Sequence, residues 1–192
     1  MRPVALRTPR LVLDLPAPAD ADLVTRYCQD PLFERCLTTP WPYSRADAEA
    51  FLTTHVPHSW ASGIEPTWAI RRHRGGILLG VISVREAQHE LGYWMGAEHR
   101  GIGLMSEAAR AVAEWTLGGG IQGASTVFWR AVVGNVASAR VARAVGFRRI
   151  EPDDAIVPTR DGGTLPAWYA VREATIDPRA HASWGDVLGV IR

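Results

Sequence analysis

The segment from Glu98 to Arg110, EHRGIGLMSEAAR, has residue types and a spacing suited to binding a phosphate group. It follows a strand-like run at 91–95 and opens a helical pattern. The glycines at Gly101 and Gly103 let the backbone turn tightly and approach a ligand without a Cβ in the way. The next backbone N–H groups are the unpaired donors of a helix start, where the helix dipole favours an anion. The sequence therefore predicts a phosphate cradle made of backbone amides.

Three other interpretations compete for this glycine-rich turn. A dinucleotide-binding fold needs a carboxylate about 20 residues further on for the ribose hydroxyl. The sequence has no Asp or Glu between Glu114 and Glu151, which argues against that fold. A Walker A loop needs a lysine, and all 21 basic residues of this chain are arginine. A surface turn without a ligand stays open when the loop is considered alone.

A second segment, Val132–Phe147, strengthens the first interpretation. A strand-like run leads into Asn135, a favourable N-cap residue, and apolar residues then recur at helical spacing up to Gly146, which fits a helix stop. The N-x-x-S pattern ending at Ser138, placed after the R-x-x-G pattern of Arg100–Gly103, resembles the acyl-CoA site of the GNAT family of N-acetyltransferases.

The N-terminal part resembles the RimJ/RimL branch of that family, which is associated with N-terminal acetylation of ribosomal proteins. The matching segments are Arg7–Leu13, Pro18–Asp22 and Pro42–Leu52, and the resemblance covers Thr8 to Ala174. It implies an α+β (mixed α/β) single domain at 1–176, with a central mixed, mostly antiparallel sheet flanked by helices. A C-terminal tail follows at 177–192, in which Trp184, Leu188 and Ile191 could share one apolar helix face.

The resemblance also implies which residues bind acetyl-CoA as co-substrate. In this family the pantetheine arm pairs with the fourth strand like an added β-strand, and a backbone N–H of that strand serves the oxyanion. The cofactor-binding residues implied in this chain are Tyr93, Trp94, Met95, Arg100, Gly101, Ile102, Gly103, Leu104, Met105, Ser106, Asn135 and Ser138.

Acetyl transfer to an amine also needs a base for the amine and a proton or hydrogen bond for the departing thiolate. Glu90 is the candidate base, through a water, although it could equally be an exposed carboxylate at a strand end; Glu86 and Glu98 are weaker candidates. Ser138 is the candidate donor to the thiolate, or a residue that completes the helix cap. Many relatives carry a tyrosine acid four residues after this serine, where this chain has Ala142.

Composition limits the remaining function classes. The net charge of +1 gives no reason to expect a nucleic acid or an anionic membrane as partner. No apolar run is long enough to span a bilayer and no signal-peptide core is visible, so we expect a cytoplasmic protein. Cys28 and Cys36 match no metal or redox spacing, and the six histidines form no metal-binding pair, so we expect no metal.

Periodicity and turn residues give the expected order of elements. Strands are expected at 10–15, 66–73, 77–85, 89–96, 126–133, 147–152 and 166–174. Helices are expected at 18–29, 44–60, 104–117 and 136–145, with a helix stop at Gly118–Gly120.

The sequence thus predicts an enzyme that moves an acetyl group from acetyl-CoA to a primary amine by direct attack. The acceptor is expected to be a peptide α-amine or a small amino compound, and the chain is compatible with a homodimer. The alternative is a catalytically weak, CoA-binding regulatory or interaction module. Trp41, Tyr43, Trp168 and Tyr169 are candidate walls of the acceptor pocket, or ordinary core and surface aromatics.

Overall fold

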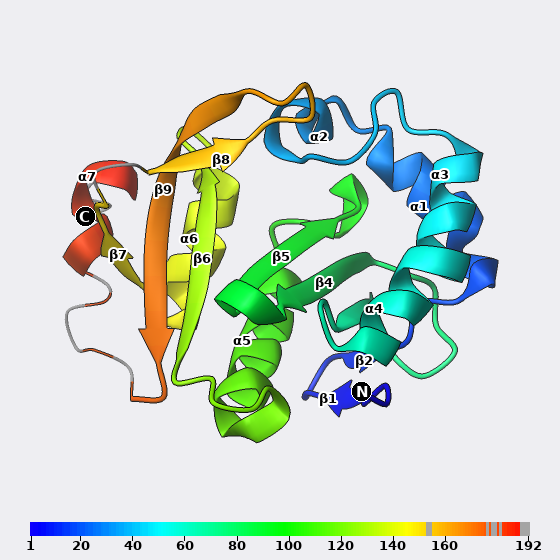
Figure 1. Ribbon diagram of the computed structural model, residues 1–192, viewed down its shortest axis with the longest axis horizontal. Helices are drawn as coiled ribbons and strands as arrows, with labels where there is room; N and C mark the ends of the chain where they lie inside the picture. The colour runs from blue at the N-terminus through cyan, green and yellow to red at the C-terminus, as the bar shows by residue number, and fades with distance from the viewer. Residues whose placement is uncertain (153–154, 176, 178–179, 181, 189–192) are drawn as a thin grey trace.

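A mixed sheet runs through the whole molecule (Figure 1). The computed structural model describes residues 1–152, 155–175, 177, 180 and 182–188. The strand order is β1-β2-β3-β4-β5-β6-β9-β7, β8 pairs with β9, and every neighbouring pair is antiparallel except β5–β6. The strands are β1 (Leu6–Arg7), β2 (Val12–Asp14), β3 (Thr67–Arg71), β4 (Gly80–Arg85), β5 (Glu90–Met95), β6 (Thr126–Val132), β7 (Arg148–Ile150), β8 (Ile156–Pro158) and β9 (Thr164–Glu173). The predicted mostly antiparallel, mixed sheet is confirmed.

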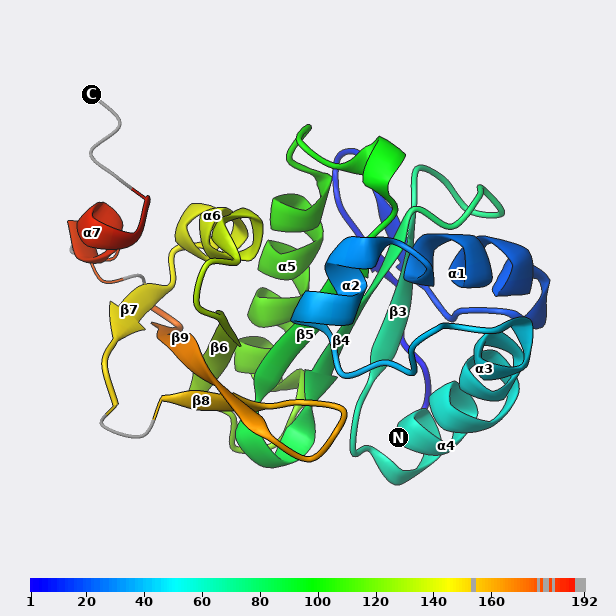
Figure 2. The ribbon, with the colours of Figure 1, turned by 90° about the horizontal axis from the view of Figure 1, so that it is seen from above.

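Helices cover both faces of the sheet, as Figure 2 shows from above. They are α1 (Ala21–Cys28), α2 (Pro31–Cys36), α3 (Arg45–Ala50), α4 (Val56–Ser62), α5 (Leu104–Trp115), α6 (Val136–Val145) and α7 (Gly185–Leu188). Alternate residues of β4 divide the core, because strand side chains point to opposite faces. Ile82 joins the apolar cluster that contains Val112 of α5, whereas Val81 joins the cluster that contains Val24 of α1.

Local sequence signals place the ends of these helices. The Ser44 side chain accepts the Asp47 N–H and the Asp47 carboxylate accepts the Ser44 N–H, which is a capping box at the start of α3. Asn135 Oδ1 accepts the Ser138 N–H at 3.2 Å, and Gly146 ends α6 with a left-handed φ of 91°. These predicted caps are confirmed.

Three local features differ from the predictions. Helix α2 was not predicted, although Asp30 followed by proline is an N-cap signal, and Asp30 accepts the Leu32 N–H at 2.9 Å. Strand β8 was also missed, because it is only three residues long. The helix expected at 104–117 continues as a π-helical turn over Thr116–Gly120, and it is interrupted within the predicted stop Gly118–Gly120, where Gly119 takes a positive φ of 97°.

The parallel strands β5 and β6 touch at one end and then separate. Glu90 pairs with Phe128, and β6 then follows β9 along the whole of Thr126–Val132. Figure 1 shows β5 and β6 diverging toward α2 and the turn that joins β8 to β9. The sheet is therefore split in its middle, at the strand where the sequence predicted the cofactor.

The described part of the C-terminal tail packs against the domain. Trp184 is 1% exposed, its ring lies edge-on to Trp129 at 5.5 Å, and its Nε1 donates to Phe147 O at 2.9 Å. Leu188 is also buried, whereas Ile191 of the predicted apolar face lies outside the described residues.

Candidate functional site

A cleft of about 1090 Å³ opens where β5 and β6 diverge. Its lining comes from α2, from Glu90–Tyr93 on β5, from the β6 strand, from the start of α6 and from the β8–β9 turn. Since β5 alternates its side chains between the two sheet faces, the cleft has a different chemistry on each face.

The predicted phosphate cradle has the expected geometry. Gly101 and Gly103 have φ values of +81° and +80°, a conformation that side chains other than glycine's rarely adopt. Within the described residues, the N–H groups of 101–106 donate to no other protein group, and the next one, of Glu107, donates to Gly103 O. Several amides therefore converge at the start of α5 without a partner, which fits the oxygens of a pyrophosphate.

The N-terminal segment braces this loop. The Glu107 carboxylate accepts from the Thr8 hydroxyl, from the Arg10 N–H at 2.9 Å and from Arg10 Nε at 2.6 Å. Arg10 Nη1 in turn donates to Ile102 O at 3.1 Å. Partial burial opposes ionisation of Glu107, but these hydrogen bonds prevail and lower the pKa of its carboxyl group. Glu107 therefore fixes the position of Arg10, and Arg10 contacts the loop at Ile102 O.

The side chains of the loop differ in burial and in the groups that they contact. Leu104 and Met105 are buried in the core, so only their backbone faces the cradle, and Ile102 is exposed. Through its guanidinium, Arg100 donates to Met95 O at 2.8 Å and pairs with Asp30 at 2.7 Å. Its N–H donates to Ala97 O, so Arg100 ties the loop to α2.

The open edge of β5 offers backbone groups to an added strand. Gly96 N donates to Leu79 O on the β4 side, and the amides along a strand alternate in direction. The N–H groups of Tyr93 and Met95 therefore face the edge from which β6 has moved away. Trp94 N–H faces β4 instead, and the Trp94 ring packs edge-on to Tyr27 at 6.4 Å on the opposite face of the sheet. A pantetheine arm would thus meet Tyr93 and Met95 through their amides.

Ser138 lies in a three-residue hydrogen-bond cluster beside this edge. Its Oγ is 3.0 Å from the Tyr93 hydroxyl and accepts from Trp129 Nε1 at 3.1 Å; Trp129 Nε1 also donates to the Tyr93 hydroxyl at 2.9 Å. Burial raises the pKa of Tyr93 to about 12, so the hydroxyl stays protonated at neutral pH. The sequence pointed to the backbone of Tyr93 and missed its hydroxyl and Trp129. Period-two alternation of Tyr93 with the buried Leu91 and Met95 was the signal that could have found it.

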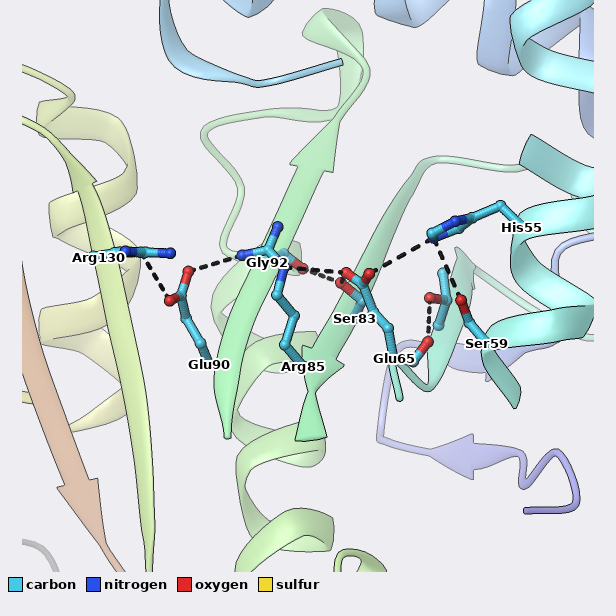
Figure 3. Close-up of polar contacts among 9 residues, drawn as sticks. His55, Ser59, Glu65, Ser83, Arg85, Glu90, Gly92 and Arg130 are labelled. Atoms are coloured by element: carbon cyan, nitrogen blue, oxygen red, sulfur yellow. Dashed lines mark hydrogen bonds and ion pairs between the residues drawn. The ribbon is translucent and has the colours of Figure 1, made fainter. Parts of the chain in front are cut away.

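Glu90 lies on the other face of the sheet, between two arginines (Figure 3). Its Oε1 accepts from Arg85 Nη1 at 2.9 Å, and its Oε2 accepts from Arg130 Nε at 2.8 Å. The Glu90 side chain is 9% exposed, so a largely buried carboxylate lies between two partly exposed positive charges. The sequence predicted Glu90 but neither of its partners, because they come from other strands.

The cluster continues toward α4 through Glu65. Glu65 Oε1 accepts from the Ser83 hydroxyl at 2.8 Å and lies 3.6 Å from Arg85 Nε, and its Oε2 lies 3.6 Å from His55 Nε2 (Figure 3). Burial opposes ionisation of Glu65, but His55, Arg85 and Ser83 lower the pKa of its carboxyl group. The hydrogen bond with Glu65 raises the pKa of His55.

Comparison with known proteins identifies the family. The family described as acetyltransferase (GNAT) domain matches residues 10–148. The chain belongs to the GNAT acetyltransferases. A search of the curated proteins finds no match.

Solved structures with this GNAT fold include enzymes that act on ribosomal proteins. A ribosomal-protein alanine acetyltransferase from Vibrio fischeri is 15% identical with a TM-score of 0.71, and the match covers 91% of this chain and 100% of that one. An acetyltransferase from Salmonella typhimurium that modifies the N-terminal serine of a 50S ribosomal subunit protein is 16% identical, with a TM-score of 0.70 and coverage of 88% and 97%. RimL, a ribosomal-protein α-N-acetyltransferase solved with coenzyme A, is 17% identical, with a TM-score of 0.70 and coverage of 91% and 100%. At these identities the likeness establishes the fold.

An arginine in the β8–β9 turn bridges the GNAT cleft. Arg160, in the β8–β9 turn, donates to Glu34 O at 3.0 Å, Leu37 O at 3.0 Å and Thr39 O at 2.9 Å. These carbonyls lie in and just after α2, where a helix has unpaired acceptors. Arg160 therefore joins the two walls of the cleft on the face that holds Glu90.

The four aromatic residues predicted as pocket walls do not line this cleft. Tyr43 is buried in the cluster beneath α1 and α3, and Trp168 packs against the main core. The Tyr169 hydroxyl donates to Ile156 O at 2.8 Å, so it holds β8 in place. Leu32, Val133 and Leu165 supply the exposed apolar surface of the cleft instead.

The described residues contain no group of three or more His, Cys, Asp or Glu side chains that could hold a metal ion. They also contain no helix long and apolar enough to cross a membrane.

Proposed function

We propose that this GNAT protein transfers an acetyl group from acetyl-CoA to a primary amine, which is a peptide α-amine or a small amino compound. The observation that carries the proposal is the split between β5 and β6. The unpartnered amides of 101–106 and the Ser138 cluster lie on one face of the split sheet, and Glu90 with its two arginines lies on the other; the cleft is lined from both faces. The coenzyme and the acceptor can therefore reach the same gap from opposite faces.

In the proposed reaction the amine nitrogen attacks the carbonyl carbon of the thioester. A C–N bond forms and the C–S bond breaks, so coenzyme A leaves as a thiolate that takes up a proton, and the amine gives up a proton. The outward amides of Tyr93 and Met95 are placed to donate to the oxyanion, since backbone N–H groups need no rearrangement during the reaction. The Ser138 hydroxyl, held by Tyr93 and Trp129, is the proposed donor to the thiolate.

Glu90 is the proposed partner of the amine. A carboxylate has about four lone-pair positions, and the two arginines use one on each oxygen. A water on a remaining position could carry the amine's proton to Glu90. The arginines fix the direction in which the carboxylate faces, which favours proton transfer at a defined place.

Calorimetric binding of acetyl-CoA, followed by thiol release with a panel of amines, tests the proposal. Acetyl-CoA should bind and stabilise the folded state by about 2.7 kcal/mol at a 100-fold excess over the dissociation constant. Gly103→Val should abolish binding, because valine is strained at a φ of +80° and its Cβ would lie 3.5 Å from Nη2 of Arg10, the side chain that contacts the loop at Ile102 O. Gly118→Ala is the matched control, since nothing lies within 4 Å of its Cβ position and its φ is not positive.

Two outcomes would contradict the proposal. Failure of the wild-type protein to bind either acetyl-CoA or coenzyme A would remove the cofactor site. Binding without thiol release for any amine would instead support the alternative of a CoA-binding regulatory module.

A further inference from the structure

The two arginines beside Glu90 each keep a nitrogen free. Arg85 contacts Glu90 through Nη1 and Glu65 through Nε, and Arg130 contacts Glu90 through Nε and Tyr169 through Nη1. Among the described residues, no protein group accepts from Nη2 of either arginine. Arg85 and Arg130 both line the cleft, with side chains 41% and 27% exposed. The cleft floor therefore has spare donors for an anion.

The floor beside these donors is left open by a glycine. A Cβ on Gly92 would lie 3.8 Å from Arg85 Nη2 and 3.2 Å from Ser83 Oγ. Gly92 faces Ser83 across β4 and β5, on the face that holds Arg85 and Glu90. Any larger residue would occupy the space in front of Arg85 Nη2, so glycine keeps room there for a ligand group.

The charges at this floor favour a ligand with both signs. Glu90 offers one negative group to an ammonium, and the two guanidinium groups are balanced by Glu90 and Glu65, so an ammonium bound alone would leave one positive charge in excess. A guanidinium is planar and compact, so a nitrogen that does not touch Glu90 still lies within one guanidinium width of that carboxylate. The ammonium and the anion of the ligand must therefore lie close together in one small molecule.

We infer that the acceptor is a free α-amino acid whose ammonium faces Glu90 and whose carboxylate binds Nη2 of Arg85 and of Arg130. An α-amino acid carries both groups on one carbon, which matches the short separation of the protein groups. A peptide N-terminus has a neutral amide at the same position and would leave a positive charge uncompensated. This inference rests on the proposed function and narrows its substrate class.

The residues at the mouth of the cleft indicate which kind of side chain the acceptor amino acid carries. Leu32 of α2, Leu165 of β9 and Val133 after β6 are 38%, 39% and 48% exposed, and all three line the cleft. An apolar amino-acid side chain that covers them gains about 25 cal/mol per Å² of apolar surface removed from water. The acceptor class is thus an apolar α-amino acid such as leucine.

The test compares L-leucine, L-leucinamide and an amidated peptide with N-terminal leucine as acceptors. For the wild-type protein, kcat/KM for leucine should exceed that for each neutral analogue by about 10- to 100-fold, the value of hydrogen bonds to a charged group. The amide is the less basic amine and the more readily deprotonated, so this preference cannot come from amine availability.

Variants connect the preference to the two arginines. Arg85→Gln and Arg130→Gln should each reduce the preference for leucine over leucinamide toward unity while acetyl-CoA affinity is retained. Arg130→Lys keeps the positive charge and serves as a control in case Arg130→Gln fails to fold. It should keep part of the preference for leucine. Arg74→Gln, at an exposed arginine in the β3–β4 turn, is the matched control and should leave the preference unchanged.

Calorimetric titration of leucine and of leucinamide into the complex with coenzyme A separates this inference from the proposed function. Equal rates for leucine, leucinamide and the peptide would overturn the inference and leave acetyl transfer standing. Tighter binding of leucine without any acetylation would overturn acetyl transfer and support the amino-acid site. Binding of neither compound, without acetylation, would overturn both. Retention of the full leucine preference in both glutamine variants would also overturn the inference.

Discussion

Removal of the Ser138 hydroxyl should lower turnover far more than it lowers stability. In the folded protein Ser138 Oγ contacts the Tyr93 hydroxyl at 3.0 Å and Trp129 Nε1 at 3.1 Å. Ser138→Ala leaves these two groups bonded to each other, since Trp129 Nε1 lies 2.9 Å from the Tyr93 hydroxyl. The variant therefore leaves no buried donor without an acceptor, and we expect a loss of about 1 kcal/mol in unfolding free energy.

The effect on turnover is larger because the proposed hydrogen bond goes to a developing thiolate. A hydrogen bond to a charged group contributes about 1.5–3 kcal/mol, which corresponds to a loss of about 10- to 100-fold in kcat. Tyr93→Phe should lose less, because Trp129 still orients the serine. The serine and tyrosine touch, so the double variant should deviate from additivity by about 0.5–3 kcal/mol.

Steady-state thiol release, with acetyl-CoA affinity from calorimetry and unfolding by urea, measures these quantities on the same samples. Ser62→Ala is the matched control, since its hydroxyl donates only to carbonyls of its own helix, His58 O at 2.8 Å and Ser59 O at 3.4 Å. Wild-type kcat in Ser138→Ala, accompanied by reduced stability, would show that the Ser138 hydroxyl only supports packing with Tyr93 and Trp129 and would refute its role in the reaction; the cap is not affected, because Asn135 accepts the backbone N–H of residue 138.

Three further predictions concern the parts that support the site. Because the pKa of Glu107 is lowered in the folded protein, its ionised carboxylate stabilises the fold above the ordinary pKa of 4.5, and this stabilisation is lost as pH falls through the folded pKa. The Tm deficit of Glu107→Gln should therefore shrink in acid, and a deficit independent of pH would contradict this. Because the pKa of His55 is raised in the folded protein, its protonated ring stabilises the fold below pH 6.5, and this stabilisation is lost as pH rises through the folded pKa. Glu65→Gln should therefore move the NMR titration midpoint of His55 down, and an unchanged midpoint would rule out the pairing. Trp184→Ala should cost about 3–5 kcal/mol in urea unfolding, because it empties a buried aromatic site; a cost under about 1 kcal/mol would show that the tail is dispensable.

The sequence predicted best what neighbouring residues decide. The left-handed turn at Gly101 and Gly103, the cap at Asn135 and the stop at Gly146 each depend on a few residues in a row, and the structure has all three. The partners of Glu90 could not be read in this way, because Arg85 and Arg130 reach it from β4 and β6 through the register of the sheet. The pairing of Arg100 with Asp30 was not predicted either, because Asp30 lies far away in the sequence, at the start of α2.

In the proposed site, the coenzyme and the acceptor are recognised on opposite faces of the split sheet. On the face of α5 and α6, the coenzyme would be held by amides whose positions depend on turns and caps, so most side-chain changes leave it intact. On the face of α2, the acceptor would meet side chains from β4, β5 and β6 whose charges balance one another. Substitutions at Arg85, Glu90, Gly92 or Arg130 can then change the accepted amine while the coenzyme site is retained. Acceptor specificity in this chain should accordingly follow the charge pattern of these four positions, and the loop at the start of α5 should carry none of it.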